Sequence, residues 1–182
     1  MHRTNEPALL AATAAIVAAV IVIVFVTGCT PKTPKKSVEL RYYPIDNMAG
    51  IITRSNVQID TAISFDGKGS LRITAPESTV VRLFETGDID AENATLVYQA
   101  KVRTENEEGN VYLEMWCSFT GMGEYFSRGF STQITGTNDW TTLETPFFLK
   151  KGQNPDNVKL DIVIAGKGIV WVDDVHLIEG RL

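Results

Sequence analysis

From Val38 to the C-terminus, the sequence consists of short runs of β-branched and aromatic residues separated by turn residues. No stretch of this part repeats apolar residues at the spacing of an amphipathic helix. Several short strands with frequent turn signals are typical of a β-sandwich or barrel, so the pattern predicts an all-β domain. The predicted strands are Val38–Tyr43, Val57–Ile63, Ser70–Thr74, Val80–Phe84, Thr95–Arg103, Asn110–Phe119, Phe126–Ile134, Thr141–Leu149, Val158–Ala165 and Ile169–Ile178.

The last predicted strand, IVWVDDVHLI, contains two adjacent aspartates, which are depleted from strands and costly to bury. Alternation along the strand places Asp173 on the same face as Trp171, Val175 and Leu177. A buried carboxylate persists where its charge is satisfied, which leaves two interpretations. Asp173 either binds a cation, for which Ca²⁺ is the one that prefers carboxylate and carbonyl oxygen, or fastens a neighbouring loop through hydrogen bonds.

Two segments are predicted to be connections between strands. Asp66-Gly67-Lys68-Gly69-Ser70 combines an aspartate suited to an Asx turn with two glycines that tolerate positive φ. The segment between Arg103 and Asn110 carries Glu105, Glu107 and Glu108, and a run of like charges usually lies in solvent. We therefore expect a solvated hairpin there.

Charge and residue usage exclude two function classes. The 17 Lys and Arg residues are outnumbered by 22 Asp and Glu residues, for a net charge of −5. Nucleic-acid binding needs clustered basic residues, so no nucleic-acid partner is predicted. The sequence also shows no metal-ligand, nucleophile–base or phosphate-loop pattern, and its only histidines are His2 and His176. No enzyme is predicted.

The N-terminal part contains 21 uncharged residues, Ala8–Gly28, which is long enough to span a bilayer. Its end, Val26-Thr27-Gly28-Cys29, resembles the bacterial lipobox. That resemblance implies that residues 1–28 are a signal peptide and that Cys29 is acylated. Residues 29–37 would then be a tether, and residues 38–182 the β-sandwich domain.

The alternative is an uncleaved transmembrane helix. The apolar run exceeds the usual length of a signal peptide, and Lys32, Lys35 and Lys36 follow it, where positive charge favours a cytoplasmic domain. The lipobox interpretation instead implies a lipid-anchored protein of the bacterial cell envelope with its domain outside the cytoplasm. In many such lipoproteins of diderm bacteria, an Asp directly after the acylated cysteine retains the protein at the inner membrane. Residue 30 is Thr, so the resemblance implies the outer membrane if the bacterium is a diderm.

Four segments between residues 64 and 178 together resemble galactose-binding-like jelly-roll domains, specifically carbohydrate-binding modules of families four and nine. They are FDGKGSLRI, YQAKVRTE, GTNDWTTLETPF and GIVWVDDVHLI, in that order. The resemblance implies a jelly-roll β-sandwich that binds glycan across its concave sheet. It also implies a structural Ca²⁺ held by Asp173 and the carbonyl of Gly67.

Alternation in the two central strands identifies the side chains that face away from the core. Core positions are expected at 96, 98, 100 and 102, and again at 111, 113, 115, 117 and 119. A sugar-binding face needs aromatic rings for the C–H faces of pyranoses and planar polar groups for their hydroxyls. The predicted glycan-binding residues are Trp116 and Tyr112 as stacking rings, and Glu114, Gln99 and Arg103 as hydrogen-bonding groups, with Asp161 as a further candidate.

Two hypotheses therefore follow from the sequence. The first is a membrane-anchored lipoprotein whose non-catalytic module binds an oligo- or polysaccharide. The second is a structural or protein-interaction module of a cell-envelope complex, in which Trp116 and Tyr112 pack under a loop formed by residues 121–126 instead of facing a sugar.

Overall fold

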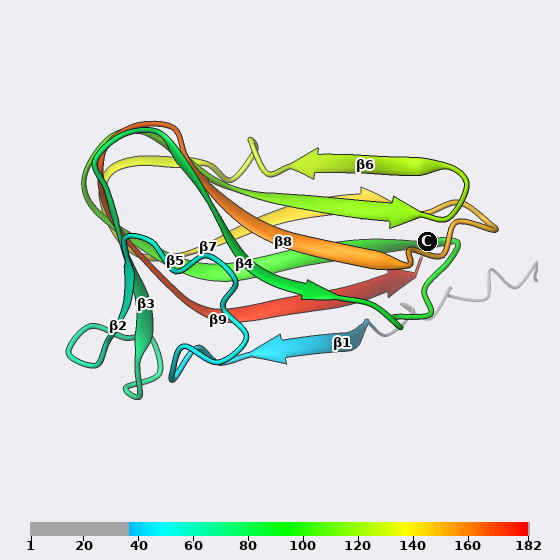
Figure 1. Ribbon diagram of the computed structural model, residues 1–182, viewed down its shortest axis with the longest axis horizontal. Helices are drawn as coiled ribbons and strands as arrows, with labels where there is room; N and C mark the ends of the chain where they lie inside the picture. The colour runs from blue at the N-terminus through cyan, green and yellow to red at the C-terminus, as the bar shows by residue number, and fades with distance from the viewer. Residues whose placement is uncertain (1–36, 182) are drawn as a thin grey trace, which may run out of the picture. The chain divides into compact units, whose positions relative to one another are not determined.

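Nine β-strands and no helix make up residues 37–181, which the computed structural model describes (Figure 1). The predicted all-β class is therefore confirmed for this part of the chain. The predicted signal or anchor helix, the cleavage site and Cys29 lie outside the described residues. The strands are β1 (Val38–Tyr43), β2 (Val57–Asp60), β3 (Ser70–Ala75), β4 (Thr79–Thr86), β5 (Ala94–Phe119), β6 (Gly123–Arg128), β7 (Ile134–Phe148), β8 (Asn157–Ile164) and β9 (Gly168–Arg181).

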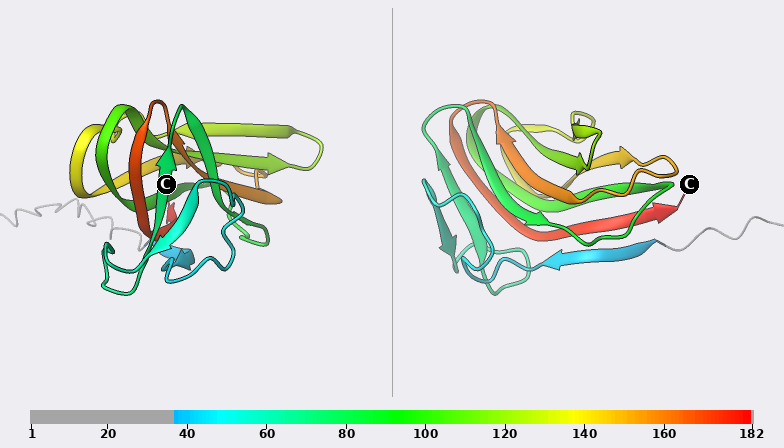
Figure 2. Two further views of the ribbon diagram at one scale, coloured as in Figure 1. Left: turned by 60° about the vertical axis from the view of Figure 1, so that its left-hand side comes forward. Right: turned by 45° about the vertical axis from the view of Figure 1, so that its right-hand side comes forward.

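All nine strands belong to one hydrogen-bonded sheet that curls over on itself (Figure 2). Its main path runs β2-β3-β9-β5-β8-β4, and β1, β6 and β7 pair with β9, β5 and β5, respectively. The first half of β5 lies between β7 and β9, and its second half lies between β6 and β8. The curled sheet therefore forms two layers, and β5 passes from the first layer into the second.

The apolar alternation predicted for the two central segments is confirmed. Leu96, Tyr98, Ala100 and Val102 are buried in the first half of β5, and Val111, Leu113, Met115, Cys117 and Phe119 are buried in the second half. Both sets belong to the same core cluster, although the first set is even-numbered and the second odd-numbered. The inward parity thus changes in between, where the pairing of β5 with β7 shifts register three times.

The predicted hairpin between Arg103 and Asn110 is wrong, because β5 is continuous there and bends between the layers. Glu107 is only 4% exposed, and its Oε1 accepts a hydrogen bond of 3.0 Å from the N–H of Gly109. A Cβ at Gly109 would lie 2.3 Å from the carbonyl oxygen of Ala165. The bend is therefore packed against the turn before β9, and glycine is what permits this close approach.

The predicted strand Phe126–Ile134 is also misplaced. The structure has β6 at Gly123–Arg128 and begins β7 at Ile134, with an irregular segment between them. Gly129 in that segment donates its N–H to the carbonyl of Leu113 and approaches the carbonyl oxygen of Glu144 so closely that a Cβ would lie 2.3 Å from it. Tertiary contacts interrupt a run whose composition favours a strand.

Within residues 37–181 no helix is long and apolar enough to cross a membrane. The predicted boundaries of the domain and its tether remain predictions, because they depend on residues before position 37.

Candidate functional site

The outer face of the second layer carries a charged row that crosses four strands. Arg128 on β6 lies opposite Glu114 on β5, Glu114 lies opposite Asp161 on β8, and Asp161 lies opposite Arg82 on β4. Residues directly opposite each other on antiparallel strands point to the same side of the sheet. The row therefore places two carboxylates side by side in its middle and one guanidinium group at each end.

Each carboxylate of the row is paired with its neighbouring arginine. Nε of Arg128 donates to Glu114, and Nε and Nη2 of Arg82 donate to the two oxygens of Asp161 at 3.0 and 3.2 Å. Glu114 is 5% exposed and Asp161 1% exposed, whereas both arginines reach the surface. Burial raises the pKa of Asp161, although Arg82 acts in the opposite direction. The paired carboxylates fix the guanidinium groups from beneath.

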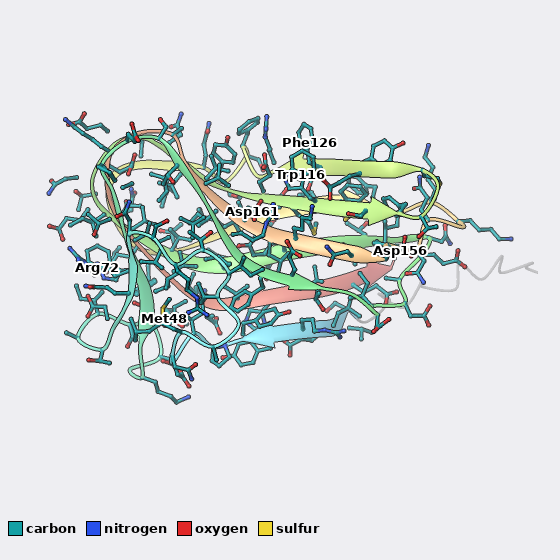
Figure 3. All side chains as sticks on the ribbon, in the orientation of Figure 1. Met48, Arg72, Trp116, Phe126, Asp156 and Asp161 are labelled. Carbon is teal, nitrogen blue, oxygen red and sulfur yellow. The ribbon has the colours of Figure 1, made fainter. Side chains whose placement is uncertain are left out.

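Aromatic rings lie next to this row on the same face (Figure 3). Trp116 lies opposite Phe126 with ring centroids 4.9 Å apart, and its Nε1 donates to Oε1 of Glu114 at 2.8 Å. The guanidinium of Arg128 lies 4.5 Å from the centroid of the Phe126 ring. Tyr112 packs edge-on against Phe130, with centroids 4.8 Å apart.

The rings on this face differ in exposure. Phe126 and Phe130 are 48% and 52% exposed, while Trp116 and Tyr112 are half-buried beside them. The predicted alternative, in which a loop covers Trp116 and Tyr112, therefore matches the structure in part. The partial cover comes from two phenylalanines that themselves lie open to solvent.

Lys159 adds a basic group beside the rings. It lies opposite Trp116 on β8, and its Nζ is 2.6 Å from Oε1 of Glu124. The hydroxyl of Ser118 donates to the same oxygen at 2.7 Å, and the bonds from Lys159 and Ser118 lower the pKa of Glu124. We call the outer surface formed by Tyr112, Glu114, Trp116, Phe126, Arg128, Lys159, Asp161 and Arg82 the β5–β8 face.

Two of the predicted site residues lie elsewhere. Gln99 and Arg103 are in the first half of β5, and they point outward from the first layer. Gln99 donates to Glu144 on β7 at 2.7 Å, and Arg103 contacts Asp139 at 3.0 Å. Because β5 changes layers between the two halves, outward positions of the first half do not share a surface with those of the second. The structure thus groups Tyr112, Glu114 and Trp116, and separates Gln99 and Arg103 from them.

Sequence reasoning missed Phe126 and Arg128 because the strand that carries them was assigned to Phe126–Ile134. Arg82 and Lys159 were missed for a different reason, since only strand order places β4 and β8 beside β5. Asp161 on β8 is the one residue from a neighbouring strand that was among the predicted candidates. A hairpin with residues 124, 126 and 128 opposite 118, 116 and 114 would have placed Phe126 and Arg128 on the same face as Trp116 and Glu114.

The aspartate pair of the closing strand forms a β-bulge. Asp174 has a φ of 51°, and the pairing of β9 with β5 shifts register at this point. The inward side of β9 consequently changes from even to odd positions: Val170 and Val172 are buried in the core before the bulge, and Val175 and Leu177 after it. Trp171 was expected on the same face as Val175 and Leu177, and this expectation is wrong, because Trp171 precedes the bulge and lies on the opposite side of β9 from those two core residues.

The Asp173 carboxylate is 1% exposed and fastens a loop. Its Oδ2 accepts the N–H of Phe65 at 2.8 Å, and its Oδ1 accepts the N–H of Asp174 at 2.8 Å. Burial raises the pKa of Asp173 to about 6. These are the contacts expected if Asp173 fastens a neighbouring loop through hydrogen bonds, here the segment before the Asp66–Ser70 turn.

A calcium ion takes six to eight oxygen ligands. No three His, Cys, Asp or Glu side chains gather into a metal-binding group anywhere in residues 37–181. Gly67 lies in the turn after Phe65, with a φ of +86°. The residues present fit calcium only if backbone carbonyls supply most of its ligands, so the ion at Asp173 and Gly67 remains a prediction.

The chain matches no protein-family model and no curated protein. Its fold, however, is similar to that of solved carbohydrate-binding modules. The family 22 xylan-binding domain CBM22-1 of Xyn10C from Paenibacillus barcinonensis is 14% identical with a TM-score of 0.58, and the match covers 80% of this chain and 97% of that one.

Two further structures give the same result. The C-terminal family 22 module of Clostridium thermocellum Xyn10B is 10% identical with a TM-score of 0.55, covering 78% of this chain and 93% of that one. A family 16 carbohydrate-binding module is 11% identical with a TM-score of 0.53, covering 72% and 92%. At these identities the comparison establishes the jelly-roll fold of carbohydrate-binding modules and leaves the ligand to be inferred from the site.

Proposed function

We propose that this chain is a non-catalytic glycan-binding module that acts through the β5–β8 face and is anchored to a bacterial membrane. The observation that carries the proposal is the pair Trp116 and Phe126 beside a fixed row of charged groups. The same jelly-roll fold serves xylan-binding domains among its structural neighbours. A sugar-binding surface combines these two elements, since rings contact the C–H faces of a pyranose and planar polar groups bind its hydroxyls.

Each part of the face has a separate role in the proposal. Phe126 and Trp116 stack on one sugar unit, and Tyr112 with Phe130 contacts another, because residues 112 and 116 are about 13 Å apart along the strand. Among the described residues, 37–181, the only hydrogen bond that Arg128 donates is the one from its Nε to Glu114. Its two terminal nitrogens are therefore available to bind sugar hydroxyls. Glu114 holds both Trp116 and Arg128 in place. We therefore expect an oligosaccharide to bind more tightly than its monosaccharide.

Calorimetric titration with xylo-oligosaccharides and a glycan array on the purified protein test this function. Trp116→Ala and Phe126→Ala should each abolish binding to whatever glycan the wild type retains. Phe65→Ala is the matched control, because Phe65 is a 44% exposed phenylalanine that packs against Trp140 and Lys101 on the first layer and should leave binding unchanged. A wild-type protein that binds no glycan on the array overturns the proposal.

The proposed anchor is a lipid on Cys29, and it would place the domain outside the cytoplasm in the cell envelope. It is supported by the VTGC ending of the apolar run. Mass spectrometry of the native protein tests it, with acylation and a start at Cys29 as the expected result. An intact chain from Met1 without added acyl mass would replace this anchor with an uncleaved transmembrane helix.

A protein-interaction module of an envelope complex is the competing function. It is favoured by exposed apolar side chains that adjoin the β5–β8 face at Phe126 without belonging to it, notably Tyr125 and Phe148 at 52% and 66% exposure. The glycan array separates the two functions, since a protein-interaction module would retain no glycan and would lose no binding with Trp116→Ala.

A further inference from the structure

Apolar side chains are exposed together at one end of the sandwich. Met122 in the turn between β5 and β6, Tyr125 on β6 and Phe148 at the end of β7 are 46%, 52% and 66% exposed. Tyr125 and Phe148 line a pocket of about 300 Å³ together with Phe119, Phe126 and Phe147, so this pocket adjoins Phe126 of the β5–β8 face. We call Met122, Tyr125, Phe147 and Phe148 the end patch. An exposed apolar cluster of this kind marks an interaction surface.

The end patch lies at the end of the domain where the chain enters it. Four residues at this end pair across neighbouring strands. Val38 at the start of β1 pairs with Glu179 on β9, Glu179 pairs with Leu96 on β5, and Leu96 pairs with Phe147 on β7. Three strand spacings of about 4.8 Å separate Val38 from Phe147, or about 14 Å. In Figure 1, β1 and β6 begin, and β5 and β9 end, on the right-hand side of the domain.

The apolar run Ala8–Gly28 ends nine residues before Ser37. Nine residues span at most about 30 Å when fully extended. Whether a lipid on Cys29 or an uncleaved helix holds the chain, the bilayer surface is therefore within about 30 Å of the end of the domain that carries the end patch. We propose that the end patch docks on the phospholipid surface, an inference that rests on the membrane attachment proposed above.

The chemistry of the end patch suits the boundary between headgroups and acyl chains. Tyrosine and phenylalanine rings partition to this region, where apolar area is buried about 5–10 Å deep. The hydroxyl of Tyr125 donates to the carbonyl of Met122 at 2.9 Å, which ties the ring to the turn. Lys150, which also lines the pocket, and the exposed Lys151 are next to Phe148 and lie within reach of lipid phosphates.

Acidic residues at the same end limit the kind of lipid. Asp88, Asp90 and Asp156 line a neighbouring pocket of about 320 Å³. Their charge repels an anionic surface, which opposes the attraction of the two lysines. Docking should therefore depend on apolar burial and be no stronger on phosphatidylglycerol than on phosphatidylcholine vesicles.

Depth-dependent quenching in vesicles of phosphatidylcholine tests this proposal on the full-length chain. A fluorophore on Met122→Cys should be quenched by lipids brominated near the headgroup. The same fluorophore on Lys167→Cys, an exposed position before β9 at the far end, should not. The only described native cysteine, Cys117, is buried, and wild-type protein gives the background from labelling elsewhere. Adding Tyr125→Ser and Phe148→Ser should reduce the quenching at position 122 at least five-fold.

Three results would overturn the docking. Equal, water-like signals at positions 122 and 167 in a chain that the vesicles retain would exclude it while leaving the attachment intact. Failure of vesicles to retain the chain would remove the attachment on which it rests. Loss of glycan binding in Tyr125→Ser/Phe148→Ser with unchanged quenching would make the end patch a sugar site. Glycan titration of Trp116→Ala reports on the proposed function separately.

Discussion

The two outer faces of the sandwich each present a tryptophan whose indole N–H is held by a carboxylate, yet they treat the ring differently. On the first layer, Nε1 of Trp171 donates to Asp60 at 2.9 Å, and the guanidinium groups of Arg72 and Arg103 each lie 5.8 Å from the ring centroid. Trp171 is 2% exposed as a result. On the second layer, Trp116 is bonded to Glu114 and remains half-exposed.

The difference lies in where the arginines are held. Arg72 and Arg103 lie over the ring of Trp171 and cover it. Arg128 instead pairs with Glu114 and lies over the ring of Phe126, so it does not cover Trp116. The same residue types thus produce a sealed surface on one layer and an accessible one on the other. Tryptophan identity alone does not distinguish a structural ring from a ligand-binding ring; the placement of its cationic neighbours does.

The largest expected effect is loss of stability on removing the sealed ring. Trp171→Ala should lower the free energy of unfolding by about 3–5 kcal/mol, since the loss of a large buried side chain leaves a cavity and removes the donor to Oδ2 of Asp60. Trp116→Ala should cost about 1 kcal/mol or less and abolish glycan binding instead. Urea unfolding and calorimetric titration of the two variants measure both quantities. Comparable losses of stability would mean that Trp116 is a core ring.

The Asp173 carboxylate should make stability depend on pH in chelator-treated protein. Its folded pKa of about 6 is above the ordinary value of 3.8, so the folded state binds the proton of this carboxyl group more tightly than the unfolded state does. The stability that protonation adds is complete below pH 3.8 and is lost as the pH rises through 6. The wild type should lose about 2 kcal/mol relative to Asp173→Asn between pH 4 and 7. Asp139→Asn is the control, because Asp139 is 86% exposed. Parallel pH profiles for wild type and Asp173→Asn would contradict this effect.

Calcium provides a second test at the same residue. If the ion is bound, chelator should lower the wild-type melting temperature and hardly change that of Asp173→Asn. Binding to the native state alone adds about 2.7 kcal/mol at a calcium concentration 100-fold above Kd. Differential scanning calorimetry with and without chelator measures it. Identical wild-type melting curves under both conditions would exclude the ion and leave Asp173 as a loop fastener only.

The sequence predicted much of the fold because alternation is a local property of a strand. β1 was predicted with the observed bounds, and every predicted core position of β5 is buried. The bend of β5 was not predictable in this way. Its parity change at residues 104–110 depends on the close approach of Gly109 to Ala165, which lies far along the chain.

The candidate site was predicted in part for the same reason. Tyr112, Glu114 and Trp116 share one strand, so alternation placed them together. Arg82, Lys159 and Phe126 join them only through the pairing of separate strands. The bulge at Asp173 and Asp174 likewise reversed the predicted side of Trp171, since one extra residue changes the parity of everything before it.

The smallest expected effects are at Gln99 and Arg103, which separate the two faces most directly. Both residues point outward from the first layer, so Gln99→Ala and Arg103→Ala should leave glycan affinity within two-fold of wild type. Arg128→Ala, an equal loss of a guanidinium group on the β5–β8 face, should weaken binding at least ten-fold. Arg103→Ala should still cost about 1 kcal/mol of stability, because it uncovers one side of Trp171. Calorimetric titration and urea unfolding of the three variants give this comparison. If Arg103→Ala weakened glycan binding as much as Arg128→Ala, the ligand would contact the first layer, and the sealed face around Trp171 would have to open on binding.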